Sequence, residues 1–213
     1  MSVELNKYES CLFEIKKRVE VVTDYVTGKK TTGYLITEVE FICLQFRKII
    51  ELIALSSLVA NKSEYEKQHA KFNEHWNARL IFQDLERLNP NFYPRPSTQT
   101  VKTSKDGQKY FDLKEISTGF MKKEDALKIY EKCGGILHAD NPYRGEKNIK
   151  DIRNQFPTWL KRLMILMNHH SIMPIDGTII VGLMKGSETG RPHASHFGQL
   201  NEQETEAMMK KLS

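Results

Sequence analysis

The chain has 213 residues, of which 28% are charged and 39% are hydrophobic, and its formal net charge is +5. This length suits one domain, or one domain with a small appendage, that buries its own core. The balanced composition excludes a disordered or collagen-like chain. The basic excess is mixed evenly with Glu, which is more typical of a solvated surface than of a nucleic-acid-binding patch.

The N-terminus has no signal-peptide pattern, and Arg47, Lys48 and Glu51 interrupt the longest apolar stretch before it could cross a bilayer. We therefore expect a soluble cytoplasmic protein without a membrane partner. The three cysteines are odd in number and have no CxxC spacing, which favours reduced and mostly buried thiols.

Two long helices are predicted in the first third of the chain. Apolar residues at alternating spacings of three and four predict the first, from Leu5 to Val26. The second, from Leu35 to Ala60, is apolar on almost every side and is expected to be central. Its polar residues Glu40, Arg47 and Glu51 fall on one stripe, which is either a solvent-facing window or a polar site.

A third helical segment is predicted from Glu64 to Arg87, with an optional interruption between Asn73 and Asn77 and with Trp76 and Leu80 on its apolar face. The region after it contains three prolines and an Asp-Gly pair between β-prone runs, which indicates a β-hairpin at about residues 97–114. Because this hairpin is weakly hydrophobic, we expect it at a sheet edge or as an arm.

Helical patterning resumes at Lys122, is interrupted by Gly134-Gly135, and returns in a last long helix whose apolar face runs from Ile152 to His170. Alternating patterns then predict three strands and a short polar helix, at residues 171–175, 178–184, 192–197 and 202–211. The sequence predicts an α+β fold with a bundle of four or five helices. The bundle and the inserted hairpin form residues 1–172, and a three-stranded antiparallel β-meander with the short helix forms residues 173–213.

Specific catalytic motifs are absent from the sequence. It has no GxxxxGK[ST], GxGxxG, HExxH, GxSxG or paired CxxC, which argues against P-loop hydrolysis, Rossmann cofactors, zincin proteases and serine esterases. His169 and His170 would diverge on a helix, and His193 and His196 would face opposite sides of a strand. We therefore expect no cofactor and no metal site.

His138 is the best candidate for chemistry because it follows the double glycine near a helix end, beside Asn141 and Arg144. An imidazole in this position could be exposed and titrate near neutral pH. The alternative is a histidine that caps the helix or bonds to a core carbonyl group.

The segment from Lys132 to His138, in a chain predicted to be largely helical, resembles the motif of the HEPN (higher eukaryotes and prokaryotes nucleotide-binding) superfamily of bacterial defence and toxin proteins. Active members carry Arg, four to six residues and then His, commonly with a polar residue after the Arg. Here Lys132 and Cys133 occupy the positions of the arginine and the polar residue. Both are departures, and lysine is a poorer phosphate clamp than the planar guanidinium.

The resemblance implies a dimeric, metal-independent ribonuclease of bacterial defence or of a toxin–antitoxin system. His138 would take the proton from a ribose 2′-OH, and Lys132, Arg47 or Arg144 would stabilise the charge on the phosphate. Glu51 could orient Arg47, and Asn141 is grouped with these candidate catalytic residues. The simpler reading of Arg47 and Glu51 is an ordinary ion pair on the wet face of the central helix.

Basic residues near aromatic ones offer an RNA-binding surface, formed by Arg95, Lys102, Lys105, Tyr143 and Arg144. A solvated loop with structural aromatics explains the same residues.

Whether the chain is an enzyme is left open, because it could also be a catalytically silent module that dimerises or holds a partner protein. A third alternative is a small-ligand sensor with a pocket between the bundle and the C-terminal strands. The candidate partners are thus RNA, a second copy of the chain and a cognate protein.

Overall fold

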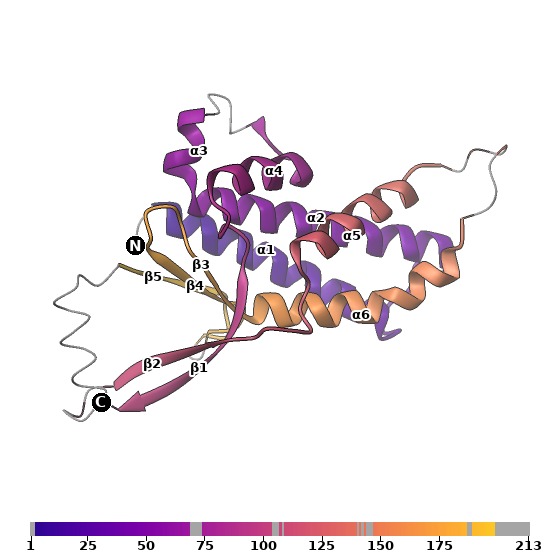
Figure 1. Cartoon of the computed structure of the whole chain (residues 1–213). Helices are drawn as coiled ribbons and strands as arrows, with labels where there is room; N and C mark the ends of the chain where they lie inside the picture. Colours follow the sequence, from indigo (N-terminus) through magenta and orange to yellow (C-terminus); the bar gives the residue numbers. More distant parts are fainter. Residues whose placement is uncertain are drawn as a thin grey trace.

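The computed structural model describes residues 3–68, 74–103, 107, 109–139, 141, 143, 147–186 and 189–198. Within this part of the chain the fold is α+β, as predicted, with six helices and a five-stranded antiparallel sheet (Figure 1). The predicted polar helix at residues 202–211 lies outside the described residues.

Helices α1 (Val3–Val26) and α2 (Leu35–Ala60) lie side by side and form the spine of the bundle (Figure 1). Helix α2 begins and ends at the predicted residues, and it contacts each of the other five helices, so its central position is confirmed. The reason is its composition, since a helix with apolar residues on most sides can bury them only when other helices surround it.

The helical segment predicted from Glu64 to Arg87 consists of two helices, α3 (Lys62–Gln68) and α4 (Ala78–Leu88). The side chain of Asn77 accepts hydrogen bonds from the backbone N–H groups of Arg79 and Leu80, which begins α4 at the optional interruption. The expected apolar face was wrong for Trp76 and Leu80, which are 63% and 56% exposed. Once Asn77 fixes the start of α4, Ile81 and Leu85 turn toward the core and Leu80 turns outward.

Helices α5 (Lys123–Ile136) and α6 (Ile149–Asn168) complete the bundle, and Gly134-Gly135 lies inside α5 instead of ending it. The last helix was predicted to extend to His170, and this was wrong. It ends at Asn168 because His169 and His170 pair with a neighbouring strand and therefore adopt an extended backbone.

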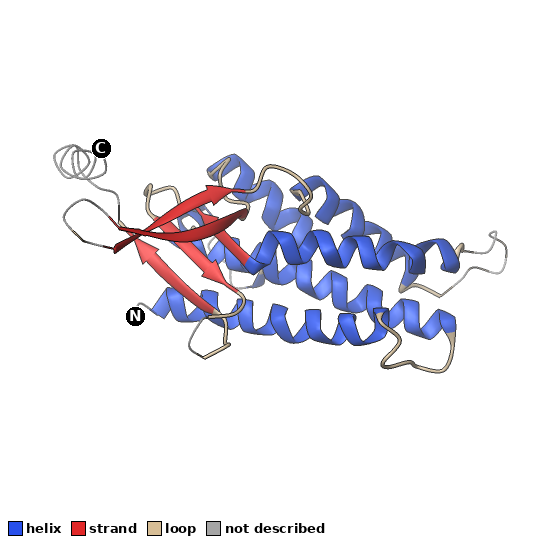
Figure 2. Ribbon diagram, turned by 90° about the horizontal axis from the view of Figure 1, so that it is seen from below, coloured by secondary structure: helices blue, strands red, loops and turns tan. Residues whose placement is uncertain are grey.

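The strands are β1 (Arg95–Thr103), β2 (Lys109–Glu115), β3 (His169–Ile172), β4 (Ile179–Leu183) and β5 (His193–Phe197). They form one sheet in the order β2-β1-β3-β4-β5, which lies at one end of the helical bundle (Figure 2). The inserted hairpin and the three later strands therefore belong to the same sheet, joined where Arg95 and Pro96 pair with Ser171 and His170.

A buried polar pair connects α1 to the inner face of this sheet. The hydroxyl group of Tyr8 lies 2.7 Å from His170 Nε2, and His170 Nδ1 lies 3.0 Å from the carbonyl oxygen of Met167. Both rings are fully buried. The carbonyl oxygen only accepts, so Nδ1 carries the hydrogen and the Tyr8 hydroxyl donates to Nε2. Burial lowers the pKa of His170 to about 4 and raises that of Tyr8.

None of the described helices has the length and apolar character needed to span a membrane. Among the described residues, no three His, Cys, Asp or Glu side chains gather closely enough to hold a metal ion.

Candidate functional site

His138 lies two residues after the end of α5, and its side chain is exposed. In the described part of the chain, no hydrogen bond or ion pair of its imidazole is found. The ammonium group of Lys147 donates to the carbonyl oxygen of His138 at 2.5 Å and reaches that of Ile136 at 3.5 Å. A cation at the carbonyl end of α5 thus fixes the backbone that carries the imidazole.

The segment after His138 presents an exposed aromatic ring. The side chain of Asn141 accepts a hydrogen bond from the backbone N–H of Tyr143 at 2.9 Å. The Tyr143 side chain is 96% exposed. Arg144, the next predicted contact, lies outside the described residues.

Lys132 lies on the exposed side of α5, between one and two turns before His138, since a turn takes about 3.6 residues. Its ammonium group donates to Gln155 Oε1 on α6 at 3.0 Å and lies 5.8 Å from the centre of the Trp159 ring. These contacts join α5 to α6 and hold the ammonium group against α6.

Arg47 and Glu51 form a cluster with Tyr130 between α2 and α5. The guanidinium carbon of Arg47 lies 3.9 Å from the centre of the Tyr130 ring, and its NH1 donates to the Tyr130 carbonyl oxygen at 3.0 Å. The Tyr130 hydroxyl donates to Glu51 Oε1 at 3.1 Å, while Arg47 NH2 lies 3.8 Å from the same oxygen. Because both side chains are about a fifth exposed, the contacts are partly shielded from water. Burial, followed by the Glu51 charge, raises the pKa of Tyr130.

Gly134 provides the space for the Arg47 guanidinium. A Cβ at this position would lie 2.5 Å from Arg47 NH1, whereas a Cβ at Gly135 would meet nothing within 4 Å. Next to this contact, the buried thiols of Cys43 and Cys133 lie against each other, and their hydrogen bond together with burial raises the pKa of Cys133. The close approach of α2 and α5 thus explains the first glycine of the pair.

Adjacent glycine substitutions test this packing. We expect Gly135→Ala to raise the free energy of unfolding by about 0.5–1 kcal/mol, because alanine favours the helix and meets open space. Gly134→Ala should lower the free energy of unfolding by about 1 kcal/mol, because it displaces Arg47 and so removes a hydrogen bond and a cation–π contact. This loss is larger than the gain from replacing glycine by alanine in the helix. Urea denaturation of both variants measures the difference of about 2 kcal/mol. Equal stabilisation by both substitutions would show that Arg47 moves without loss.

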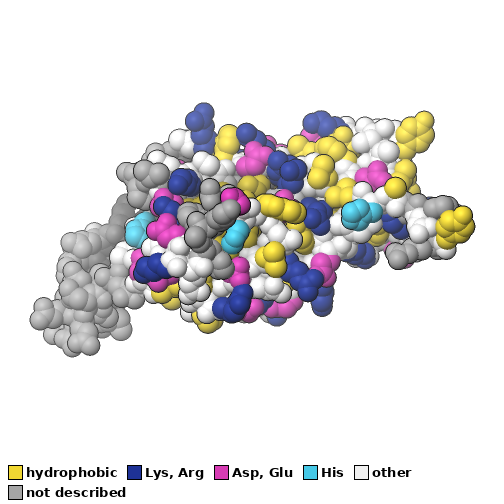
Figure 3. Space-filling view, turned by 90° about the horizontal axis from the view of Figure 1, so that it is seen from above, with side chains coloured by type: hydrophobic (Ala, Val, Ile, Leu, Met, Phe, Trp, Pro, Cys, Tyr) yellow, Lys and Arg dark blue, Asp and Glu magenta, His cyan; other side chains and the backbone are white. Residues whose placement is uncertain are grey.

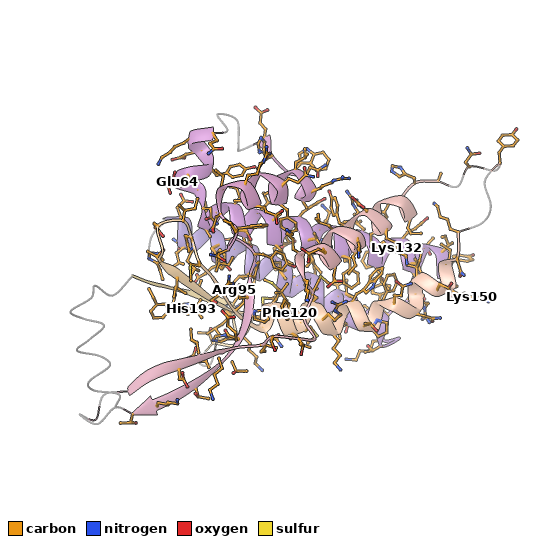
Figure 4. The ribbon with its side chains drawn as sticks, in the orientation of Figure 1. Glu64, Arg95, Phe120, Lys132, Lys150 and His193 are labelled. Atoms are coloured by element: carbon orange, nitrogen blue, oxygen red, sulfur yellow. The ribbon has the colours of Figure 1, made fainter. Side chains whose placement is uncertain are left out.

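The predicted RNA-binding residues do not form one group with His138. Arg95 and Lys102 lie on β1, at the sheet end of the molecule, whereas Lys132 and Lys150 lie toward the other end (Figure 4). Arg95 bonds to Asn91 at 2.5 Å and approaches Glu115 at 3.5 Å, and Lys102 pairs with Asp112 at 2.5 Å. Lys105 lies outside the described residues. Lys and Arg are interspersed with Asp and Glu over the face in Figure 3, with no large patch of one sign.

A cavity of about 270 Å³ lies between the helices and the C-terminal strands, at the place expected for a ligand sensor. It is lined by residues of α1, the junction of α2 and α3, and the segment around β4 and β5, including Glu4, Lys62, Asp176 and His196. Lys62 pairs with Glu4 at 3.2 Å and with Glu66 at 3.8 Å. On the helical side of this cavity one cation, Lys62, is thus shared by two carboxylates, and the lining there keeps an excess of negative charge.

The structure brings Arg47 and Glu51 together, and it places Lys132 on the exposed side of α5 and His138, Asn141 and Tyr143 beyond the last residue of that helix. It shows no hydrogen bond or ion pair between these two groups in the described part of the chain. Sequence reasoning missed three residues that orient these groups, namely Tyr130, Lys147 and Gln155. Tyr130 had a signal, since it is one turn before Gly134. The partners of Lys147 and Gln155 depend on how α5 and α6 pack, which has no local signature.

No protein-family model, no curated protein and no solved structure matches this chain.

Proposed function

We propose that the chain is a HEPN-like protein of bacterial defence or of a toxin–antitoxin system that cleaves RNA without a metal ion, with His138 as the base. A two-fold dimer belongs to this proposal, because the resemblance that motivates it implies one. The arrangement of the long helices supports it: α1, α2, α5 and α6 form a bundle, and the Lys132–His138 segment occupies the end of α5 and the start of the connection to α6.

The observation that carries the proposal is the exposed imidazole of His138, which has no partner in the described part of the chain. Histidines that serve structure bond with neighbouring groups, as His169 and His170 do here. The backbone of His138 is anchored by Lys147 and its side chain is exposed, and imidazole is the side chain that most often serves as a general base in catalysis. The exposed Tyr143 ring, five residues further along the chain, offers a surface on which an unpaired base can stack.

The reaction would be an internal displacement at phosphorus. His138 would remove the proton of the ribose 2′-OH, the 2′-oxygen would attack the adjacent phosphorus atom, and the 5′-oxygen would leave with a proton from solvent. The products are a 2′,3′-cyclic phosphate and a 5′-hydroxyl end. Lys132 would stabilise the charge on the phosphoryl oxygens. Arg47 would act at a distance, by holding Tyr130 and the α5 backbone in place.

The test is incubation of the purified protein with total RNA and tRNA in EDTA, with mapping of cleavage sites and end groups. We expect cleavage that leaves 2′,3′-cyclic phosphates, and a loss of about 100-fold or more in His138→Ala because proton transfer is removed. Lys132→Ala should slow the reaction and weaken binding in a salt-dependent way.

Two exposed residues provide matched controls. His196 lies on β5, at the opposite end of the molecule from the end of α5, and Lys161 is exposed on α6. His196→Ala and Lys161→Ala should cleave RNA like the wild type. The proposal fails if the wild-type protein leaves RNA intact, or if His138→Ala cleaves as fast as His196→Ala.

A second candidate function is a catalytically silent module that binds a partner protein. The observation that favours it is the engagement of Lys132 with Gln155 and Trp159, which holds its ammonium group on the bundle surface. A stable complex with a cognate protein, together with no salt-sensitive affinity for RNA, would support this alternative.

A further inference from the structure

The face of the sheet that points away from the helices carries two serine–histidine pairs on either side of an apolar row. In register across the strands, Leu183 lies between His169 and His193, and Val181 lies between Ser171 and Ser195. Residues alternate along each strand, so these side chains share a face, while His170, Ile172 and Gly182 point to the helices. The sheet therefore brings polar groups from separate strands onto one apolar surface.

The pair formed by Ser97 and His169 has a structural explanation. His169 Nδ1 lies 2.7 Å from the Ser97 hydroxyl oxygen and Nε2 lies 2.9 Å from Gln99 Oε1. These contacts extend the connection between β1 and β3 beyond their two paired positions. Ser97 is buried and the partner of its histidine is a neutral amide, so this pair lacks both access and a carboxylate.

The pair formed by Ser195 and His193 differs because it ends in a carboxylate. The Ser195 hydroxyl oxygen lies 3.3 Å from His193 Nε2, and His193 Nδ1 lies 3.0 Å from Glu9 Oε1 on α1. A carboxylate only accepts, so it holds the hydrogen on Nδ1 and leaves Nε2 to accept from the serine hydroxyl. This is the order of serine, histidine and acid that activates a serine nucleophile, and it is recognised by its geometry, so it does not require the GxSxG motif that the sequence lacks.

In this series of hydrogen-bonded residues, Glu9 is held in place and His193 is accessible to solvent. Glu9 Oε1 also accepts the backbone N–H of Ala194 at 2.8 Å, which ties the carboxylate to the edge strand β5. The His193 side chain is 49% exposed and lies at the sheet end of the molecule (Figure 4). A substrate can therefore reach the imidazole of His193, while the contact with Glu9 maintains the orientation of the imidazole ring.

A groove of about 410 Å³ runs beside Ser195 on the same face, and its walls are largely apolar: Leu113, Ile179, Val181, Leu183 and Phe197. His193, Ser195 and Gln99 complete the lining. An alkyl chain lying in this groove would contact the apolar side chains and would lie next to the serine hydroxyl.

We propose that Ser195, His193 and Glu9 form a second catalytic site, distinct from the His138 region, which hydrolyses esters of apolar carboxylic acids. The acyl chain lies along the groove. Ser195 Oγ attacks the acyl carbon while His193 Nε2 takes its proton, and the ester oxygen leaves with that proton. Water then attacks the acyl-serine, giving up a proton to His193, and the free acid and Ser195 are released as the proton returns to Ser195 Oγ.

The free edge of the sheet supplies a donor for the developing negative charge. The N–H of Ala194 turns away from β4 toward Glu9, and N–H groups alternate between the two sides of an antiparallel strand. The N–H of His196, the residue after Ser195, therefore points to the same open edge. A backbone N–H next to the nucleophile is able to stabilise the oxyanion of the tetrahedral intermediate.

The experiment uses a fluorophosphonate probe and p-nitrophenyl esters of acetic, butyric and octanoic acid with the full-length protein. We expect probe labelling at Ser195 and faster hydrolysis of the longer esters, with both lost in Ser195→Ala and His193→Ala. Glu9→Gln keeps the hydrogen-bond acceptor for Ala194 and should lower kcat roughly 100-fold with little change in KM, which identifies Glu9 as a positioning residue.

Two control variants separate this site from its surroundings. Ser171→Ala removes a hydroxyl from the same face, opposite Val181, and should keep full labelling and hydrolysis. His138→Ala should also keep them, so that failure of RNA cleavage and failure of ester hydrolysis are read independently. Absence of labelling and hydrolysis in the wild type overturns the proposal, and so does equal labelling of Ser195→Ala and Ser171→Ala in proteins with unchanged melting temperatures.

Discussion

Gly182→Ala is expected to lower the free energy of unfolding by about 3–5 kcal/mol, through overpacking and a broken buried hydrogen bond. A Cβ at this position would lie 2.6 Å from both Cε1 and Nε2 of His170 and 3.2 Å from Leu12 Cδ1. The imidazole cannot withdraw freely, because Tyr8 binds Nε2 and Met167 binds Nδ1. Thermal or urea denaturation with Gly135→Ala as the control measures this loss.

A double-mutant cycle assigns the loss to the imidazole. His170→Ala opens the space beside position 182, although it leaves the Tyr8 hydroxyl without its partner and is itself destabilising. In this background, Gly182→Ala should cost about 2 kcal/mol less than in the wild type. An equal cost in both backgrounds would place the strain on Leu12 or on the β4 backbone.

The free energy of unfolding is expected to fall by about 3 kcal/mol through His170 alone as the pH is lowered from about 6.5 to about 4. The cause is burial, which lowers the pKa of His170 to about 4 in the folded chain from its ordinary value of 6.5. In this pH range the unfolded chain binds a proton at this residue and the folded chain does not. The stability is therefore complete above pH 6.5 and is lost as the pH falls toward 4.

Comparison with His170→Gln isolates this contribution. The variant is less stable than the wild type at neutral pH, but glutamine does not titrate, while the carboxylates contribute equally to both proteins. The difference in unfolding free energy between the two should narrow by about 3 kcal/mol from pH 7 to pH 4, as measured by urea denaturation at each pH. A difference that stays constant over this range would mean that the pKa of His170 in the folded protein is not lowered from its value in the unfolded chain.

The sequence by itself determined the elements whose signals are local. The apolar periodicity of Leu35–Ala60 predicted α2 at its observed ends, because a helix with no polar face must be surrounded. The Asp106-Gly107 pair between β-prone runs predicted the β1–β2 hairpin, and Gly107 has a positive φ of 85°. The location of His138 near a helix end followed from the double glycine, although the helix includes both glycines.

Only the tertiary structure decided which groups meet. Arg47 stacks on Tyr130 across 83 positions of sequence, Tyr8 binds His170 across 162, and Glu9 binds the backbone of Ala194 across 185. The extension of the hairpin into a five-stranded sheet depends on two residue pairs between β1 and β3, and the pairing of β3 with β4 ends the last helix at Asn168. Such contacts form because distant segments share one core, and they leave no periodic pattern in the segments themselves.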